Sequence, residues 1–366
     1  MNKAAYHAPT KVQRAELEEQ VRKSVERALS RNIPGLALQQ ASLELEVGPT
    51  PKEIVYTRDS LRLYHYLPMT DEVYRVPVLI VMSPVARGYI LDLAKGQSFI
   101  EYLLLQGYDV YLMDWVPPRR EHAHLGMKDF ALELIDESIA HVQQDSGETE
   151  VSVVGYCLGG FLAAVNAAVH DKGPIRNLVC FTTPVNAEGM ALYKAWVETQ
   201  AFDIDRLVDA LGVIPGDMIN ASIQALRPLQ KQANQMQLLN NVEDDAFVKA
   251  SLRFDRWATE QLPVAGALAR DLVNDFLRGN KLVRGDYVLD DKQVDLGKIC
   301  VPFLHVAAEY DHIVPTAASS DLVKLVGSKD KNEIVVKGGH VSLIAGGNAV
   351  YRLWPQLDKW LSVRSV

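Results

Sequence analysis

Cysteine is scarce in this sequence, and long apolar runs are missing from it. The 366 residues contain only three cysteines, Cys157, Cys180 and Cys300. An odd number of widely separated cysteines does not suit a disulfide framework, so we expect a cytoplasmic protein in a reducing environment. We find no apolar run of the roughly 18 residues that a membrane-spanning helix needs, and no signal-peptide core near the first residue. The chain is therefore predicted to be neither transmembrane nor secreted.

An excess of positive charge is also absent. The sequence has 38 Lys and Arg residues against 46 Asp and Glu residues, which gives a formal net charge of −8. Nucleic-acid binding favours a basic face, so this balance argues against nucleic acid as a partner. Apolar side chains, by contrast, make up 48% of the sequence. Together with the length, this fraction predicts a globular protein with a large core, built as one domain or as one domain with an insertion.

Short β-branched runs alternate with helix-like patterns along most of the chain. Continuous apolar runs are typical of strands that are buried on both faces. Their alternation with helical patterns predicts an α/β fold with a mostly parallel central sheet. The expected strands are 53–57, 61–67, 78–82, 109–115, 151–154, 177–181, 301–307 and 333–336, and the expected helices between them are 92–106, 129–145 and 160–170.

The strand signal disappears between Pro184 and about residue 296. This stretch is helix-like and interrupted by turn signals, so we predict that 185–296 is a helical insertion that forms a mobile cap. A charged amphipathic helix is expected at 11–32, within an N-terminal helical segment 1–50. The remaining ranges, 51–184 and 297–366, are predicted to form the core.

The strand expected at 151–154 runs directly into Gly-Tyr-Cys-Leu-Gly-Gly at 155–160. This layout is typical of a nucleophile elbow with cysteine in place of serine. Glycines beside the nucleophile remove side chains that would clash in so tight a turn. The backbone N–H of Leu158, at a helix N-terminus, is the expected first oxyanion donor, and that of Val85 or Ala86 the second. The alternative is a buried Cys157 beside a sharp turn.

An acid and a base follow the cysteine in the chain order that α/β-hydrolases use. Asp311 follows the strand expected at 301–307, and His340 follows the strand at 333–336 and two glycines. We therefore predict a triad in which Cys157 is the nucleophile, His340 the base and Asp311 the acid that orients the base. His312, next to Asp311, is kept as an alternative base.

Five further histidines are expected to lie at the surface or to be structural, since no group of ligands has metal-binding spacing, and the two remaining cysteines are expected to be inert packing residues. They are His122, His124, His141, His170, His305, Cys180 and Cys300. Arg87, in the loop that follows the strand at 78–82, is equally compatible with binding an anionic group of a substrate and with a structural salt bridge.

Six segments in chain order resemble one family, the polyhydroxyalkanoate (PHA) synthases. The resemblance covers most of the chain, and the length is similar to that of the catalytic subunit of the class III (two-component) or class IV enzymes. Asn186, Ala86 and Thr316 depart from the residues common in the family, which leaves substrate preference open but removes no triad residue. The matching segments are 89–93, 107–115, 155–160, 182–185, 311–315 and 338–340.

The resemblance implies an α/β-hydrolase fold and an acyltransferase that polymerises 3-hydroxyacyl-CoA thioesters into polyester with release of CoA. It implies covalent thioester intermediates on Cys157 and no cofactor or metal. It also implies a second, non-catalytic synthase subunit, a homo- or hetero-oligomer, and a location at the surface of PHA granules, where the growing polyester chain collects. Two alternatives stay open: a cysteine-dependent ester or thioester hydrolase, and a non-catalytic granule-surface protein.

Overall fold

The structure is a computed structural model that describes residues 45–170, 172–241 and 243–366. The helix expected at 11–32 and nearly all of the segment 1–50 lie outside the described residues. By their contacts, the described residues divide into two compact units. One consists of Leu45 and 229–256, and the other of 46–228 and 257–366. This division differs from the cap expected at 185–296, whose boundaries stay a prediction.

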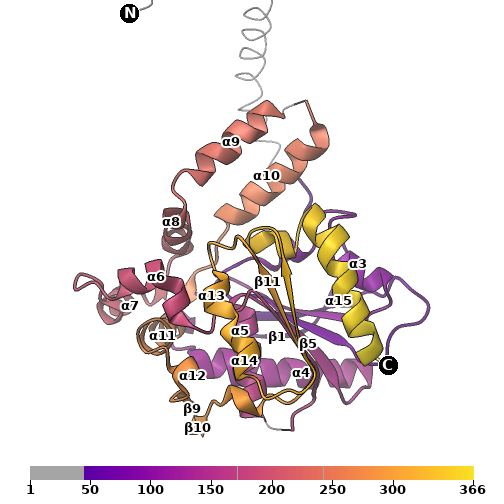
Figure 1. The fold of residues 1–366 in the computed structure, drawn as a ribbon, viewed down its shortest axis with the longest axis horizontal. Coiled ribbons are helices and arrows are strands. Elements are labelled where there is room, and N and C mark those ends of the chain that lie inside the picture. Colours follow the sequence, from indigo (N-terminus) through magenta and orange to yellow (C-terminus); the bar gives the residue numbers. More distant parts are fainter. Residues whose placement is uncertain (1–44, 171, 242) are drawn as a thin grey trace, which may run out of the picture. The chain divides into compact units, whose positions relative to one another are not determined.

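An eight-stranded sheet forms the centre of the larger unit, in the order β1-β2-β4-β3-β5-β6-β11-β12 (Figure 1). The strands β4, β3, β5, β6, β11 and β12 are parallel to one another, while β1 and β2 are antiparallel to their neighbours. The strands are β1 (Lys52–Arg58), β2 (Leu61–Tyr66), β3 (Val78–Val81), β4 (Val110–Trp115), β5 (Val151–Tyr156), β6 (Ile175–Phe181), β11 (Phe303–Ala308) and β12 (Lys331–Val336). The predicted mostly parallel α/β sheet is therefore confirmed, with all eight strands at the expected places.

Helices lie on both sides of this sheet (Figure 1). On one side α3 and α15 pack together, with Phe99 and Tyr102 against Trp354, and α5 lies on the other side. The central strand β3 is buried along its whole length, as expected of a strand covered on both faces. The helices around the sheet are α3 (Phe99–Leu105), α4 (Leu134–Ser146), α5 (Leu158–Val169), α13 (Thr316–Ser319), α14 (Asp321–Leu325) and α15 (Trp354–Leu361).

The stretch 185–296 is mainly helical, as predicted. The expectation that it contains no strands is wrong, because two short strand pairs occur in it. β7 (Val213–Ile214) pairs with β8 (Val264–Ala265), and β9 (Val288–Leu289) with β10 (Lys292–Gln293). Strands of two residues carry no periodic signal, so the sequence could not reveal them. The helices here are α6 (Ala191–Val197), α7 (Ile204–Leu211), α8 (Gly216–Leu226), α9 (Gln230–Asn240), α10 (Asp245–Thr259), α11 (Gly266–Asp271) and α12 (Lys281–Arg284).

Several shorter helical turns connect these elements. The 3₁₀ turns are η1 (Gly88–Leu91), η2 (Arg120–His122), η4 (Ala187–Met190), η6 (Leu296–Lys298), η7 (His340–Leu343) and η9 (Ser362–Arg364), and the π-helical turns are η3 (Asp129–Glu133), η5 (Leu272–Arg278) and η8 (Ala349–Leu353). The start of α11 is tied to a loop of the core, because the N–H groups of Ala267 and Leu268 donate to the carbonyls of Ala123 and Leu125.

The helix predicted at 92–106 begins later than expected, at Phe99. The fully buried carboxylate of Asp92 accepts hydrogen bonds from Thr50 N–H (3.0 Å), Thr50 Oγ1 (2.7 Å) and Ser98 Oγ (2.7 Å). These bonds hold 92–98 in a loop. Ser98 then caps α3, because its hydroxyl oxygen accepts the N–H of Glu101.

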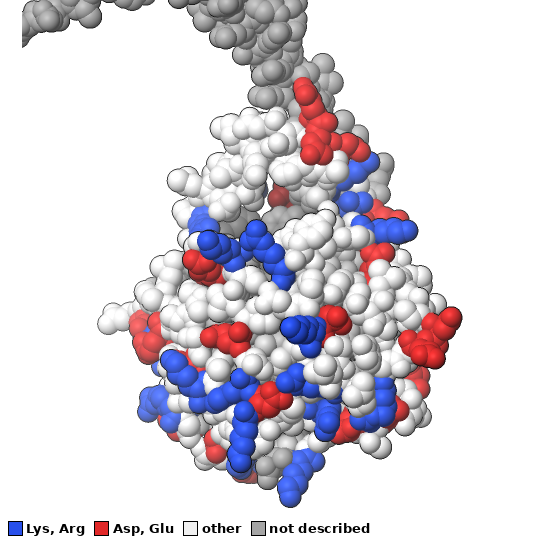
Figure 2. All heavy atoms as spheres, turned by 45° about the vertical axis from the view of Figure 1, so that its right-hand side comes forward, with Lys and Arg blue, Asp and Glu red and all other residues white. Residues whose placement is uncertain are grey.

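Charge is mixed on the surface, and basic and acidic side chains lie among one another on the face drawn in Figure 2. No helix in the described part of the chain is both long enough and apolar enough to cross a membrane.

We expect Asp92→Ala to lower the free energy of unfolding by about 3 kcal/mol, because it leaves both buried donors of Thr50 without their acceptor and leaves the Ser98 hydroxyl with only its longer bond to the carbonyl of Leu91 (3.4 Å). Urea unfolding measures this change, with the exposed Asp71→Ala as the matched control. Equal midpoints for the two variants would show that the Asp92 network contributes no stability.

Candidate active site

Cys157 connects β5 to α5 without an intervening loop. Its backbone has φ +56° and ψ −123°, a conformation that non-glycine residues rarely adopt. Glycine is needed beside it, since a Cβ at Gly155 would lie 2.3 Å from the Cα of Gly160, and one at Gly159 would lie 2.0 Å from the carbonyl oxygen of Val81. The predicted strand–turn–helix elbow is therefore the local structure at Cys157, whose side chain is largely buried (8% exposed).

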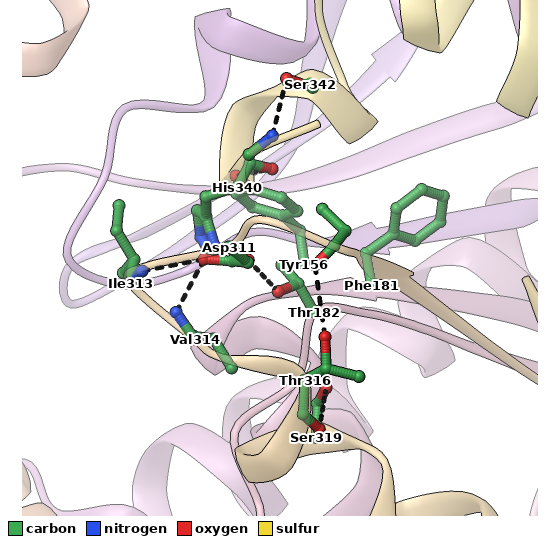
Figure 3. Close-up of polar contacts among 12 residues, drawn as sticks. Tyr156, Phe181, Thr182, Asp311, Ile313, Val314, Thr316, Ser319, His340 and Ser342 are labelled. Atoms are coloured by element: carbon green, nitrogen blue, oxygen red, sulfur yellow. Dashed lines mark hydrogen bonds and ion pairs between the residues drawn. The ribbon is translucent and has the colours of Figure 1, made fainter. Parts of the chain in front are cut away.

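The loops after β11 and β12 bring Asp311 and His340 together. These strands are parallel neighbours, so the loops after them leave the sheet at the same edge. His340 Nδ1 lies 2.7 Å from Asp311 Oδ2, and both side chains are buried (Figure 3). The His340 ring also lies beside Tyr156, the residue before Cys157, with 5.2 Å between ring centroids. The structure thus brings the acid and the base predicted from the sequence next to the elbow.

Besides His340, three other groups hydrogen-bond the carboxylate of Asp311 (Figure 3). Its Oδ1 accepts the backbone N–H groups of Ile313 (2.9 Å) and Val314 (2.8 Å), and its Oδ2 accepts the hydroxyl of Thr182 (2.5 Å). Burial favours the neutral acid, but the charge of His340 and these hydrogen bonds outweigh it and lower the pKa of Asp311. The side chain is therefore held as a carboxylate in one orientation.

The environment of His340 favours its protonated form. Burial alone would lower the pKa of this imidazole, but the negative charges of Asp311 and Cys157 and a hydrogen bond to each of them raise the pKa to about 10. His340 therefore lies between two groups that stabilise a positive charge. This is the arrangement needed to hold a proton taken from the Cys157 thiol.

Two backbone N–H groups lie on the elements expected to supply an oxyanion hole. Leu158 is the first residue of α5, so its N–H has no acceptor within the helix. The loop after β3 lies beside the elbow, because Gly159 packs against the end of that strand. In this loop the N–H of Ala86 donates to Ser83 (3.1 Å). Of the two expected second donors, Val85 is therefore the one whose N–H is not used in that turn.

The turn that carries Val85 is anchored from a distant part of the chain. The N–H of Leu262 donates to the carbonyl of Val85 (2.9 Å), and Trp257 Nε1 donates to the carbonyl of Arg87 (2.9 Å). Both donors belong to the segment predicted as the cap. A movement of 257–262 would therefore be transmitted to the Val85 turn.

Arg87 lies close enough to Asp114 for its charge to act on that carboxylate. Burial raises the pKa of Asp114, and hydrogen bonds from Trp115 and Gly88 together with Arg87 oppose the rise. Asp114 is thus a nearby opposite charge, while Nε of Arg87 is buried without a hydrogen-bond partner among the described residues. Both the salt bridge and the binding of a substrate anion stay predictions.

The alternative base His312 is not bonded to Asp311, whose Oδ2 is already engaged by His340. Its Nδ1 is buried without a hydrogen-bond partner among the described residues, and burial followed by the charge of Arg227 lowers its pKa.

The other histidines singled out in the sequence lie elsewhere, and no cluster able to hold a metal occurs within the described ranges. Their partners are Arg119 for His122, Glu121 for His124, Tyr56 for His141, Asp136 for His170 and Glu333 for His305.

The two other cysteines differ from each other. Cys180 is buried on β6, and its burial raises the pKa of the thiol to about 12, as suits an inert packing residue. Cys300 is exposed, so the expectation that it packs in the interior is wrong. It lies in the turn before β11, where its side chain is not covered.

Two residues near the site were not identified from the sequence. Thr182 contacts Asp311 although 129 positions separate them, and no local pattern reports such a contact. Tyr193 on α6 is largely buried, and burial together with the charges of Cys157 and Asp311 raises its pKa. Its hydroxyl also interacts with Ser222 on α8. The segment expected to cover the site therefore does contribute a side chain close to Cys157.

Two families match this chain. The one described as "alpha/beta hydrolase fold" matches residues 90–346, and the one described as "Poly-beta-hydroxybutyrate polymerase (PhaC) N-terminus" matches 28–103. A putative lipase from Sulfolobus solfataricus has a similar structure, with a TM-score of 0.57 and 18% identity over 86% of this chain and 99% of that one. The predicted α/β-hydrolase fold is confirmed; at this identity the likeness concerns the fold alone.

Curated relatives extend the match over most of the chain. The protein named "Poly(3-hydroxyalkanoate) polymerase subunit PhaC" from Allochromatium vinosum is 36% identical over 328 residues, which cover 87% of this chain and 90% of that protein. The protein of the same name from Haloferax mediterranei is 34% identical over 324 residues, 88% of this chain and 66% of the relative. This chain therefore spans nearly all of the first relative and just under two thirds of the second.

The raised pKa of His340 predicts a specific pH dependence of stability. Because the folded-state pKa lies above that of the unfolded chain, the stabilisation is complete below about pH 6.5 and is lost as the pH rises towards 10. We expect the difference in unfolding free energy between the wild type and His340→Gln to shrink over this interval. Urea unfolding at pH 6, 8 and 10 tests this, and a difference that stays constant would contradict it.

Proposed function

This chain belongs to the poly(3-hydroxyalkanoate) polymerase subunit PhaC family, and we propose that it polymerises 3-hydroxyacyl-CoA thioesters through a covalent thioester on Cys157. The observation that carries the proposal is the cysteine at the elbow beside a buried His340–Asp311 pair. A thiol beside a base that is itself oriented by an acid is the arrangement that activates a nucleophile.

In the first step the Cys157 thiolate attacks the carbonyl carbon of the acyl-CoA, while His340 holds the proton from the thiol. A carbon–sulfur bond to Cys157 forms and the bond to the CoA sulfur breaks. The CoA thiolate takes the proton from His340 and leaves. Thioester exchange is nearly balanced in energy, so the acyl group on Cys157 stays activated.

In the second step the hydroxyl of another 3-hydroxyacyl unit attacks the acyl-Cys157 carbonyl. His340 accepts the hydroxyl proton, the ester bond forms, and the Cys157 thiolate is released. Asp311 orients the ring of His340 and stabilises its charge throughout. The N–H groups of Leu158 and Val85 are the proposed donors to the oxyanion in both steps. The proton and bond changes balance without a metal or cofactor, so we propose none.

The burial of the site supports polymerisation over hydrolysis. The same acyl-enzyme yields an ester or a free acid, depending on whether an alcohol or water reaches it. Cys157 is 8% exposed and His340 5% exposed, so bulk water has little access to the carbonyl. The predicted cap at 185–296 has to let substrate in and polymer out, so we propose that it opens during turnover.

The partners and location of the protein are proposed from family resemblance. We propose a second, non-catalytic subunit as in the two-component synthases, assembly into a homo- or hetero-oligomer, and a cytoplasmic location at the surface of PHA granules. We propose no nucleic-acid partner, in line with the net charge of −8.

The test is CoA release from 3-hydroxybutyryl-CoA, with turbidity from insoluble polymer followed in parallel. We expect Cys157→Ala to abolish both, by at least about a thousandfold, because it removes the nucleophile. Cys300→Ala is the matched control, since it removes an exposed thiol and should behave as the wild type.

Both assays are run with and without a partner subunit from a two-component synthase. CoA release with free 3-hydroxy acid under both conditions would indicate a hydrolase and contradict the proposal. Full activity of Cys157→Ala would contradict the assignment of the nucleophile.

A further inference from the structure

We propose that Thr182 is a positioning residue, whose hydroxyl fixes Asp311 in the orientation that His340 requires. This inference rests on the proposed function, because it assigns Thr182 a task in the reaction of that same site. Thr182 does not touch the reacting atoms and acts through Asp311.

Thr182 is well placed for this task. It directly follows β6, the strand that lies between β5, which leads to Cys157, and β11, which leads to Asp311. Its side chain is fully buried, and its N–H donates to the carbonyl of Val306 on β11 (2.6 Å). The backbone of Thr182 is thus bound to the strand that carries the acid.

The hydroxyl of Thr182 completes the set of donors around the carboxylate (Figure 3). Oδ1 of Asp311 accepts two backbone N–H groups, while Oδ2 lies 2.7 Å from His340 Nδ1 and accepts the Thr182 hydroxyl at 2.5 Å. Thr182 is therefore the side chain besides His340 that hydrogen-bonds the oxygen facing the imidazole. Without it, Oδ1 would keep its two backbone donors, but Oδ2 would have His340 as its one remaining hydrogen-bond partner among the described residues.

The backbone at this position is strained. Thr182 has φ +41°, which is a marked outlier for a β-branched residue. Such a conformation costs on the order of 1–3 kcal/mol and persists only where the surroundings hold it. Glycine would relieve this strain but would carry no hydroxyl. The chain keeps a hydroxyl at a position whose backbone favours glycine, which points to a task for the hydroxyl.

The next residue offers a control that is matched in type and burial. Thr183 is also fully buried, but its hydroxyl donates to the carbonyl of Phe181 (3.3 Å) instead of Asp311. Thr182→Val and Thr183→Val each replace a buried hydroxyl by a methyl of similar size. A purely structural role for the hydroxyl would give both variants similar effects.

The experiment measures kcat and KM for CoA release from pH 3 to 9, a range that includes the titration of Asp311, and urea unfolding, for both valine variants. We expect Thr182→Val to lower kcat by about tenfold to a hundredfold, with KM within about twofold, because a charge-assisted hydrogen bond is lost. The acid limb of the kcat profile should move to higher pH, since the Thr182 hydroxyl lowers the pKa of Asp311. Thr182→Ser, which keeps the hydroxyl, should restore both the rate and the profile, and Thr183→Val should leave them as in the wild type.

Thr182→Gly keeps the test decisive if the valine variant folds poorly. It removes the hydroxyl and the backbone strain together, so we expect a stability closer to that of the wild type but the same loss of kcat. Wild-type kcat and pH profile in Thr182→Gly or Thr182→Val, or an equal loss in Thr183→Val, would overturn the proposal. Cys157→Ala is assayed alongside as the inactive reference. A wild type that releases no more CoA than Cys157→Ala would refute the proposed function, and not the task assigned to Thr182.

Discussion

The turn at Cys157 is the constraint on which the site depends. A buried strand passes into a buried helix at one residue, and this is possible only because α5 approaches β5 and the end of β3 at backbone contact. Side chains at Gly155 and Gly159 would fill that space. The same contact brings the loop that carries Val85 beside the first N–H of α5. One tight turn thus presents the thiol and sets the two expected oxyanion donors near it.

The order of the parallel strands brings the other residues of the site to Cys157. β6 and β11 follow β5 in the sheet, and β12 follows β11. All four strands point the same way, so the residues after them meet at one edge. This topology explains how Cys157, Thr182, Asp311 and His340, which are far apart in the sequence, come to lie in one buried cluster. It also explains how the acid and the base are positioned, because each stands a few residues beyond a strand of the sheet.

Much of this arrangement could be predicted from the sequence because it depends on local patterns. Apolar runs identified the eight strands, and the positions of Asp311 and His340 just beyond two of them led to their prediction as acid and base. The contact of Thr182 with Asp311 could not be predicted, because it depends on how strands 129 residues apart align. The loop before α3 was missed for a similar reason: the buried Asp92 binds Thr50, which a helical pattern in 92–106 does not reveal.

The central claim is that the growing chain is attached to Cys157. The most direct measurement uses a saturated acyl-CoA that lacks the 3-hydroxyl, which can acylate the thiol but cannot extend a polymer. Mass spectrometry of the digested protein should then find one acyl group, on the peptide that contains Cys157, and none in Cys157→Ala. An acyl group on another residue, or CoA release from this substrate without any acylated peptide, would contradict the account.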